Sequence, residues 1–203
     1  MIWDKLYNQK KHMSVWPWTS VISLVNQFLK KNKKTIKVLE VGCGVGANIP
    51  FFNNRNFDYY GFDVSKVAIN YLKKKFPKLK NNLFVLDIEK KDIPVKNFDL
   101  VIDRGCLIHV KKKNNLSVLD RIFDATKKNS LIVFTDLISK KTKIDKNYDF
   151  FKIDNFYSKK RIKSTFKKKK ILYCSEEIKK IIGMPFIVSK KIVTIKIFKS
   201  VRC

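Results

Sequence analysis

Short apolar segments recur along the middle of the chain and alternate with stretches whose apolar residues have helical spacing. Five segments have the length and composition of β-strands: 35–41, 59–62, 82–86, 98–102 and 130–135. The pattern between them predicts helices at 48–52, 66–75 and 117–127 and a short element near Lys91. Strands that alternate with crossover helices form a parallel sheet covered on both faces. The pattern therefore predicts a doubly wound α/β fold.

Different patterns flank this core. Before it, apolar positions from Val21 to Leu29 lie on one face of a helix that would cover the sheet. After Leu137 the alternation ends, and 171–174 and 192–198 are predicted as antiparallel strands. These two strands would close a mostly parallel, seven-stranded, Rossmann-like sheet with a C-terminal hairpin. A length of 203 residues suits one domain.

A glycine-rich loop, Gly42-Cys-Gly-Val-Gly46, follows the first predicted strand and opens a helix. Its glycines let a ligand approach the backbone closely at the carboxyl edge of the sheet. Gly42, Gly44 and Ala47 also fit a dinucleotide fingerprint, and Asp63 follows at the spacing of a ribose-binding acid. The loop alone does not distinguish a binding site for a dinucleotide from one for S-adenosylmethionine.

Acidic residues near the ends of the predicted strands favour S-adenosylmethionine. Glu40 would repel a pyrophosphate and attract the ammonium of a methionine moiety. Asp87 follows the third strand, where it could receive an adenine amino group while Ile88 packs on the ring. Asp103 ends the fourth strand beside the same cleft. This set of carboxylates suits a cationic nucleoside.

Four motifs in this order resemble the class I S-adenosylmethionine-dependent methyltransferases: V-L-E-V-G-C-G-V-G at 38–46, G-F-D-V-S at 61–65, L-D-I at 86–88 and F-D-L-V-I-D-R-G at 98–105. The resemblance implies that Gly42, Gly44 and Gly46 line the cofactor and that Asp63 holds the ribose. It also implies that Val64, Asp87 and Ile88 address the adenine, and that Asp103 and Arg104 border the methionine tail. We expect one domain over 1–203, with a helical lid over 1–34 and a cofactor-binding core over 35–136.

Two histidines and two tryptophans are further candidate site residues. If the methyl acceptor is a hydroxyl or an ammonium, a base must take a proton, and His109 is the first candidate with His12 second. A packing role for His109 is the alternative. Trp16 and Trp18 flank Pro17 and could shield a sulfonium or grip a substrate cation, or simply seal the sheet edge.

The charge of the chain is strongly positive, with 45 Lys and Arg against 17 Asp and Glu and a formal net charge of +28. Only five of these basic residues are Arg, whereas sites that read phosphate or guanine favour guanidinium groups. We interpret the lysines mainly as a compositional bias. The predicted function is methyl transfer to O, N or S of a small, anionic metabolite or glycan precursor. An RNA methyltransferase or nucleic-acid-binding protein is the alternative, and a nicotinamide oxidoreductase ranks third.

The cysteines and histidines indicate neither a disulfide framework nor a metal site. The four cysteines form no C-x-x-C pair, and His12 and His109 lack metal-ligand spacing. Isolated thiols and the lack of an N-terminal apolar segment favour a cytoplasmic protein. No apolar run is long enough to predict a membrane helix.

Overall fold

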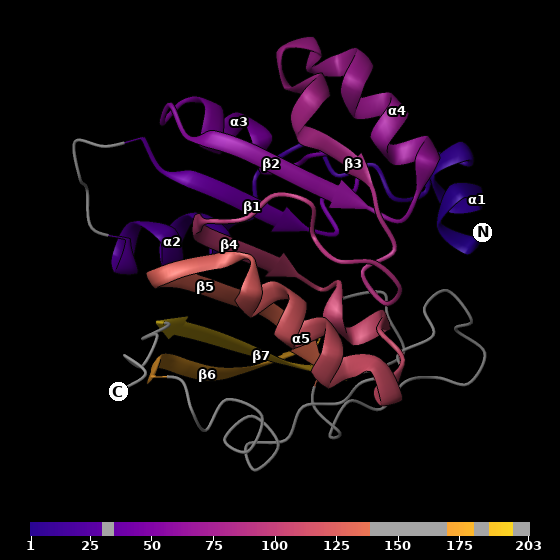
Figure 1. Ribbon diagram of the computed structural model, residues 1–203. Coiled ribbons are helices and arrows are strands. Elements are labelled where there is room, and N and C mark those ends of the chain that lie inside the picture. The colour runs from indigo at the N-terminus through magenta and orange to yellow at the C-terminus, as the bar shows by residue number, and fades with distance from the viewer. Residues whose placement is uncertain (30–34, 139–169, 181–186, 197–203) are drawn as a thin grey trace.

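The computed structural model describes residues 1–29, 35–138, 170–180 and 187–196 of the chain. Its sheet has the order β3-β2-β1-β4-β5-β7-β6 (Figure 1). The first five strands pair in parallel, and β7 pairs antiparallel with β5 and β6. The strands are β1 (Lys37–Val41), β2 (Asp58–Asp63), β3 (Leu83–Val85), β4 (Phe98–Arg104), β5 (Thr126–Ile138), β6 (Lys170–Lys180) and β7 (Ile187–Lys196). The predicted mostly parallel, Rossmann-like fold is confirmed.

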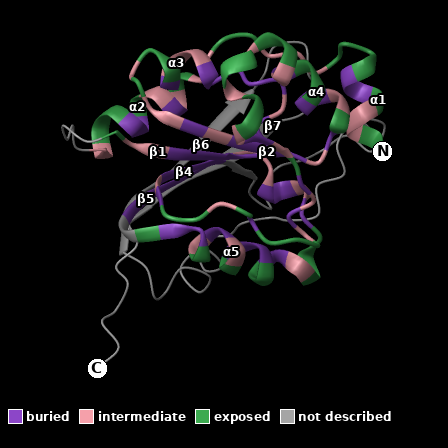
Figure 2. Cartoon of the chain, turned by 45° about the horizontal axis from the view of Figure 1, so that its top comes forward, coloured by how far each residue is buried: buried purple, intermediate pink, exposed green. Residues whose placement is uncertain are grey.

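Helices cover both faces of the sheet because the buried strand residues alternate between two apolar clusters. Val38 of β1 packs in one cluster with α2, α3 and α4, whereas Leu39 and Val41 pack in the other with α5. Figure 2 shows the buried strands between helices whose outer surfaces are exposed. The helices are α1 (Ile2–Asn8), α2 (Thr19–Phe28), α3 (Ile49–Asn53), α4 (Lys66–Lys75) and α5 (Asn115–Asp124), with 3-10 turns η1 (Pro77–Asn82), η2 (Leu107–His109) and η3 (Lys112–Asn114).

Strands β5, β6 and β7 begin earlier than the predicted strands, and three further elements differ from the sequence-based expectation. The helix expected to reach residue 127 ends at Asp124, since Thr126 already pairs with Phe98 as the start of β5. The element near Lys91 is a turn, in which the Lys90 and Lys91 N–H groups donate to the Asp87 carbonyl. Helix α1 was not predicted as a separate helix, although a helical lid was expected over 1–34. The linker at 30–34 and the end of the last predicted strand at 197–198 lie outside the described residues.

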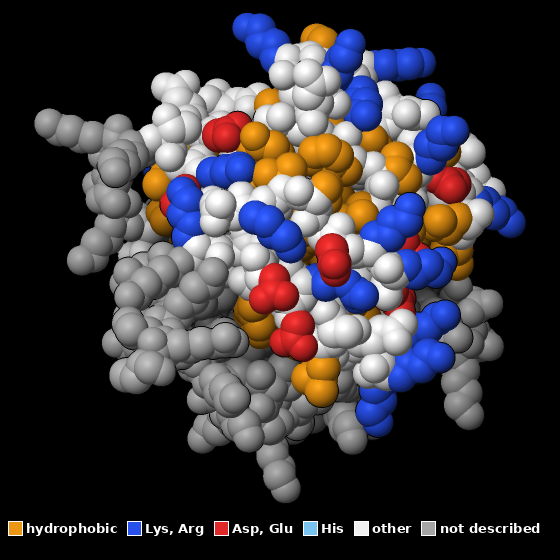
Figure 3. Space-filling view, in the orientation of Figure 1, with side chains coloured by type: hydrophobic (Ala, Val, Ile, Leu, Met, Phe, Trp, Pro, Cys, Tyr) orange, Lys and Arg blue, Asp and Glu red, His pale blue; other side chains and the backbone are white. Residues whose placement is uncertain are grey.

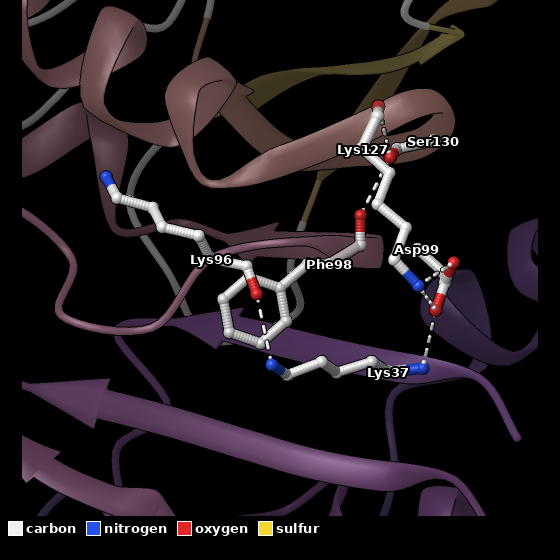
Figure 4. Close-up of polar contacts among 6 residues, drawn as sticks. All are labelled: Lys37, Lys96, Phe98, Asp99, Lys127 and Ser130. Atoms are coloured by element: carbon white, nitrogen blue, oxygen red, sulfur yellow. Dashed lines mark hydrogen bonds and ion pairs between the residues drawn. The ribbon is translucent and has the colours of Figure 1, made fainter.

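Polar contacts join the beginnings of β1, β4 and β5 at one edge of the sheet (Figure 4). Asp99 accepts from the Lys37 backbone N–H at 3.0 Å and from Lys127 Nζ at 2.8 Å. Lys37 Nζ donates to the Lys96 carbonyl at 3.0 Å, and Ser130 Oγ donates to the Phe98 carbonyl at 2.7 Å. These contacts hold the three strands in register, so that their carboxyl ends meet at the opposite edge.

Candidate functional site

A cavity of about 680 Å³ lies at the carboxyl ends of β1, β2 and β4. The arrowheads of β1 and β2 point toward α1 there (Figure 1). Helix α1 contributes Ile2, Trp3 and Tyr7 to the lining of this cavity, and Met1 just before the helix also lines it. The structure brings eight of the predicted site residues together in the lining: His12, Gly42, Asp63, Val64, Asp87, Ile88, Arg104 and His109.

Two positions of the glycine loop require glycine because neighbouring side chains pack closely against them. Gly42 and Gly44 adopt φ values of +65° and +54°, in the left-handed region that disfavours other residues. A Cβ at Gly42 would lie 2.7 Å from Cys106 Cβ, and one at Gly44 would lie 2.8 Å from the Tyr7 hydroxyl oxygen. Glycine at these two positions therefore lets Cys106 and α1 approach the loop.

Asp63 ends β2 at the wall of the cavity. Its carboxylate accepts hydrogen bonds from the Gly44 N–H at 2.9 Å and the Ser65 N–H at 2.8 Å. Its side chain is only 7% exposed, and this burial raises the pKa of Asp63 while the two backbone N–H groups oppose the shift. The contacts fix the carboxylate between the glycine loop and the start of α4.

The loop after β3 forms another wall. Asp87 accepts from the Glu89 N–H and forms an ion pair of 2.9 Å with Lys90 Nζ. Ile88 is buried and lines the cavity. Asn114 donates to the Glu89 carboxylate at 2.6 Å, which joins this loop to the beginning of α5.

Aromatic rings from α1 surround the two predicted bases. The Trp3 ring meets the His109 ring edge-on at a centroid distance of 5.0 Å, and it lies 5.7 Å from the His12 ring. Burial lowers the pKa of His12, and the positive charge of Arg104 lowers it further. His12 is therefore neutral at pH 7 and can accept a proton. Sequence reasoning did not assign Trp3 or Tyr7 to the site, although their i, i+4 spacing on one helix face was a usable signal.

Asp4 anchors α1 beside α4. Its carboxylate accepts from Ser65 Oγ at 2.6 Å and from the Val67 N–H at 3.2 Å. The hydrogen bond from Ser65 lowers the pKa of Asp4. Ser65 is the N-cap of α4 and Val67 lies in its first turn, and the N-terminus of a helix favours a negative charge. Asp4 thus holds Trp3 and Tyr7 over the cavity.

Six predicted site residues do not line the cavity. Glu40 is 4% exposed, and its two oxygens accept from Asn48 Nδ2 and the Tyr59 hydroxyl, both at 2.7 Å. Asp103 is fully buried and accepts from the Leu107 N–H at 3.1 Å. The other four are Gly44 beside Tyr7, Gly46 against Ile49 and Leu72, Trp16, which is 82% exposed, and Trp18, which stacks on Arg104.

Cys106 lies beside the glycine loop as a thiol. Burial raises the pKa of Cys106 well above its ordinary value. Such a group is un-ionised at neutral pH and is a poor nucleophile. Among the described residues, no three His, Cys, Asp or Glu side chains are grouped to hold a metal ion.

The surface does not gather its positive charge into one patch on the face shown in Figure 3. Lys and Arg side chains are spread there among acidic and apolar ones. A contiguous basic face beside the cavity was the main expectation of the nucleic-acid alternative. No helix in the described part of the chain is long and apolar enough to cross a membrane.

Comparisons with known proteins agree with this geometry. The family model described as a methyltransferase domain matches residues 11–169. The chain is 28% identical over 144 residues to O-methyltransferase 3 of Dictyostelium discoideum, which covers 61% of this chain and 33% of that protein. It is 24% identical over 102 residues to phosphoethanolamine N-methyltransferase of Plasmodium falciparum isolate 3D7, with 49% and 38% covered. The chain thus spans a third to two fifths of the length of these relatives.

Solved structures share the fold. TehB from Haemophilus influenzae superposes with a TM-score of 0.74 at 16% identity, covering 97% of this chain and 67% of that one. Phosphoethanolamine N-methyltransferase 2 of Haemonchus contortus, solved in complex with S-adenosyl-L-methionine, superposes with a TM-score of 0.68 at 14% identity, covering 91% and 54%.

Proposed function

The chain belongs to the methyltransferase domain family and has the fold of the class I S-adenosylmethionine-dependent enzymes, and from this premise we propose its activity. It binds S-adenosylmethionine in the cavity and transfers the methyl group to O, N or S of a small acceptor. The observation that carries this proposal is the Asp63 carboxylate, fixed by two backbone N–H groups beside a glycine loop. The two oxygens of a buried, oriented carboxylate can accept hydrogen bonds from the two hydroxyls of a ribose.

The residues around the cavity fit the rest of the cofactor. Gly42 lines the cavity at the carboxyl edge of β1, and Val64 and Ile88 provide apolar surfaces for a purine ring. Asp87 lies at the same wall, where its carboxylate could accept from an exocyclic amino group. Asp103 supports this site from within the core through the Leu107 N–H.

The bound cofactor supplies an activated methyl group, so this chain mainly has to align the acceptor and exclude water. Trp3, Tyr7 and Ile2 of α1 line the cavity, and we propose that they act as part of the helical lid expected over 1–34. For a hydroxyl or ammonium acceptor, His109 is the first candidate for the base that takes the proton, and His12 is the second. Both residues line the cavity. A thiol acceptor would need no such base.

We propose an anionic small molecule, such as a phosphorylated or carboxylated metabolite or glycan precursor, as the acceptor. Arg104, Lys90 and Lys111 line the cavity and would attract it. Among the relatives, the phosphoethanolamine methyltransferase is named for a phosphate-bearing substrate. A nucleic-acid acceptor is not favoured. We also propose one domain over the chain and a reducing, cytoplasmic compartment, which suits the free thiols of Cys43 and Cys106.

The dissociation constant for S-adenosylhomocysteine, the demethylated product of the cofactor, tests this proposal. We expect binding to the unchanged protein and a loss of about 10- to 100-fold in Asp63→Asn, as for a lost charged hydrogen bond. Asp120→Asn is the control, because Asp120 is exposed on α5. Melting temperatures show whether each variant is folded. No binding at millimolar ligand, or a folded Asp63→Asn protein with unchanged affinity, would contradict the proposal.

A further inference from the structure

Arg121 of α5 holds the loop after β3 from outside the cavity. Its side chain is 23% exposed, and it is not among the residues that line the cavity. Its Nη1 group donates to the Ile88 carbonyl at 3.2 Å and to the Glu89 carbonyl at 3.4 Å. Its Nε group donates to Asp92 Oδ1 at 2.9 Å. One guanidinium thus joins three acceptors of the same loop, which suits the planar fork of arginine.

Further contacts attach this loop to α5 and to the turn before it. Asn114, the last residue of η3, donates from Nδ2 to the Glu89 carboxylate at 2.6 Å. The Ile88 side chain is buried in the same apolar cluster as Ile122, the neighbour of Arg121 on α5. The side chains and the backbone of the loop are therefore both held by this part of the chain. The loop takes its position from α5 as well as from β3.

The orientation of the Asp87 carboxylate depends on where this loop lies. Asp87 directly precedes Ile88, lines the cavity and has a side chain that is 32% exposed. Its Oδ1 accepts from the Glu89 N–H at 3.1 Å, and its Oδ2 pairs with Lys90. Each carboxylate oxygen can accept a second hydrogen bond, so these contacts orient the group and leave acceptor capacity for a ligand. Because the orienting N–H belongs to Glu89, a shift of the backbone that Arg121 holds would move the carboxylate too.

We propose that Arg121 is a positioning residue for recognition of the adenine base. It acts through the carbonyls of Ile88 and Glu89, and so sets where Asp87 meets the exocyclic amino group of the purine. A purine with a carbonyl at that position would instead bring an oxygen acceptor against a carboxylate. The inference rests on the proposed function and deepens it, since it names a residue outside the cavity on which base selectivity depends.

Two nucleosides that differ only in the base test this role. S-Adenosylhomocysteine carries an amino group at the six-position of its purine, and S-inosylhomocysteine carries a carbonyl there. We expect the unchanged protein to bind the adenine compound at least about 10-fold more tightly, as for a hydrogen bond to a charged group. In Arg121→Met this ratio of dissociation constants should fall below about threefold, through weaker binding of S-adenosylhomocysteine.

Three further variants accompany Arg121→Met. Arg121→Gln also loses the charge and the fork, so it should show the same fall, and it takes the place of Arg121→Met if melting temperatures show that protein to be unfolded. Arg121→Lys keeps a cation that can donate to the same carbonyls, and it should retain more of the ratio. Arg55→Met is the matched control, because Arg55 lies over the Phe51 ring of α3 and does not line the cavity.

A double variant separates positioning of Asp87 from a general weakening of the fold. Asp87→Asn alone should lower the ratio, because an amide can both accept from an amino group and donate to a carbonyl. If Arg121 acts through Asp87, adding Arg121→Met to Asp87→Asn should change the ratio by less than about twofold. A full further loss in the double variant would contradict the inference.

Two other results would overturn it. One is an unchanged ratio in the folded Arg121→Met or Arg121→Gln protein. The other is equal binding of both nucleosides by the unchanged protein, which would leave no base selectivity for Arg121 to support. Failure of the proposed function is distinct from both, because the unchanged protein would then bind neither nucleoside.

Discussion

Glu40 shows how the surroundings of one residue change its chemistry. The carboxylate lies inside the protein between Asn48 and Tyr59. Burial raises the pKa of Glu40 from its ordinary 4.5 to about 7, although both hydrogen bonds and the charge of Arg104 oppose the shift. The folded protein therefore keeps a proton on Glu40 in a pH range where the unfolded chain has lost it.

The contribution of Glu40 to the free energy of unfolding should accordingly fall as the pH rises from about 4.5 to about 7. In that window the folded state binds one proton more than the unfolded state, which makes the slope of stability against pH negative. A shift of this size corresponds to a loss on the order of 3 kcal/mol across the window. Urea unfolding at several pH values measures it.

Glu40→Gln is the matched variant for this measurement, because glutamine has the same shape and stays neutral. The stability of the unchanged protein should decrease relative to Glu40→Gln between pH 4.5 and 7. Parallel curves for the two proteins would show that Glu40 does not titrate in this range.

At the scale of elements, α1 depends on one polar anchor. The helix is short, from Ile2 to Asn8, and an isolated helix of this length is not stable in water. Asp4 binds the first turn of α4, and Leu6 and Tyr7 are buried. The cover of the cavity is thus held by tertiary contacts rather than by its own helix propensity.

Asp4→Ala should loosen this cover without unfolding the domain. We expect faster amide hydrogen exchange in residues 2–8 and dissociation of S-adenosylhomocysteine that is faster by about 3- to 10-fold. The melting temperature should change by less than about 2 °C, since the main core lies elsewhere. Lys5→Ala, an exposed neighbour on the same helix, is the control. Equal exchange rates in the two variants would refute the anchoring role.

At the scale of the whole molecule, the net charge of +28 acts against compactness. Like charges repel one another more strongly in the folded state, and salt screens this repulsion. The melting temperature should therefore rise by at least about 3 °C between roughly 20 mM and 300 mM NaCl. KCl should give the same rise, which separates screening from binding of a particular ion. A falling melting temperature would show that attractive ion pairs dominate.

The alternation of apolar segments was sufficient to predict where β1 to β5 and the helix Lys66–Lys75 lie along the chain, because strands and amphipathic helices have distinct periods. The end of α5 was missed, since strand pairing at Thr126 overrides the local helical pattern. The motifs indicated Gly42, Asp63, Asp87 and Arg104, which all line the cavity. Their positions follow from the rule that carboxyl ends of parallel strands share one edge.

The sequence by itself determined the α/β fold and the edge of the sheet that carries the site, because periodicity and glycine-rich turns are local properties of the chain. Only the tertiary structure decided that Glu40 faces Asn48 and Tyr59, that Trp18 contacts Arg104 and that Trp3 joins His12 and His109. These contacts join residues far apart in the sequence. They depend on side-chain packing between elements, for which a single chain carries no local pattern.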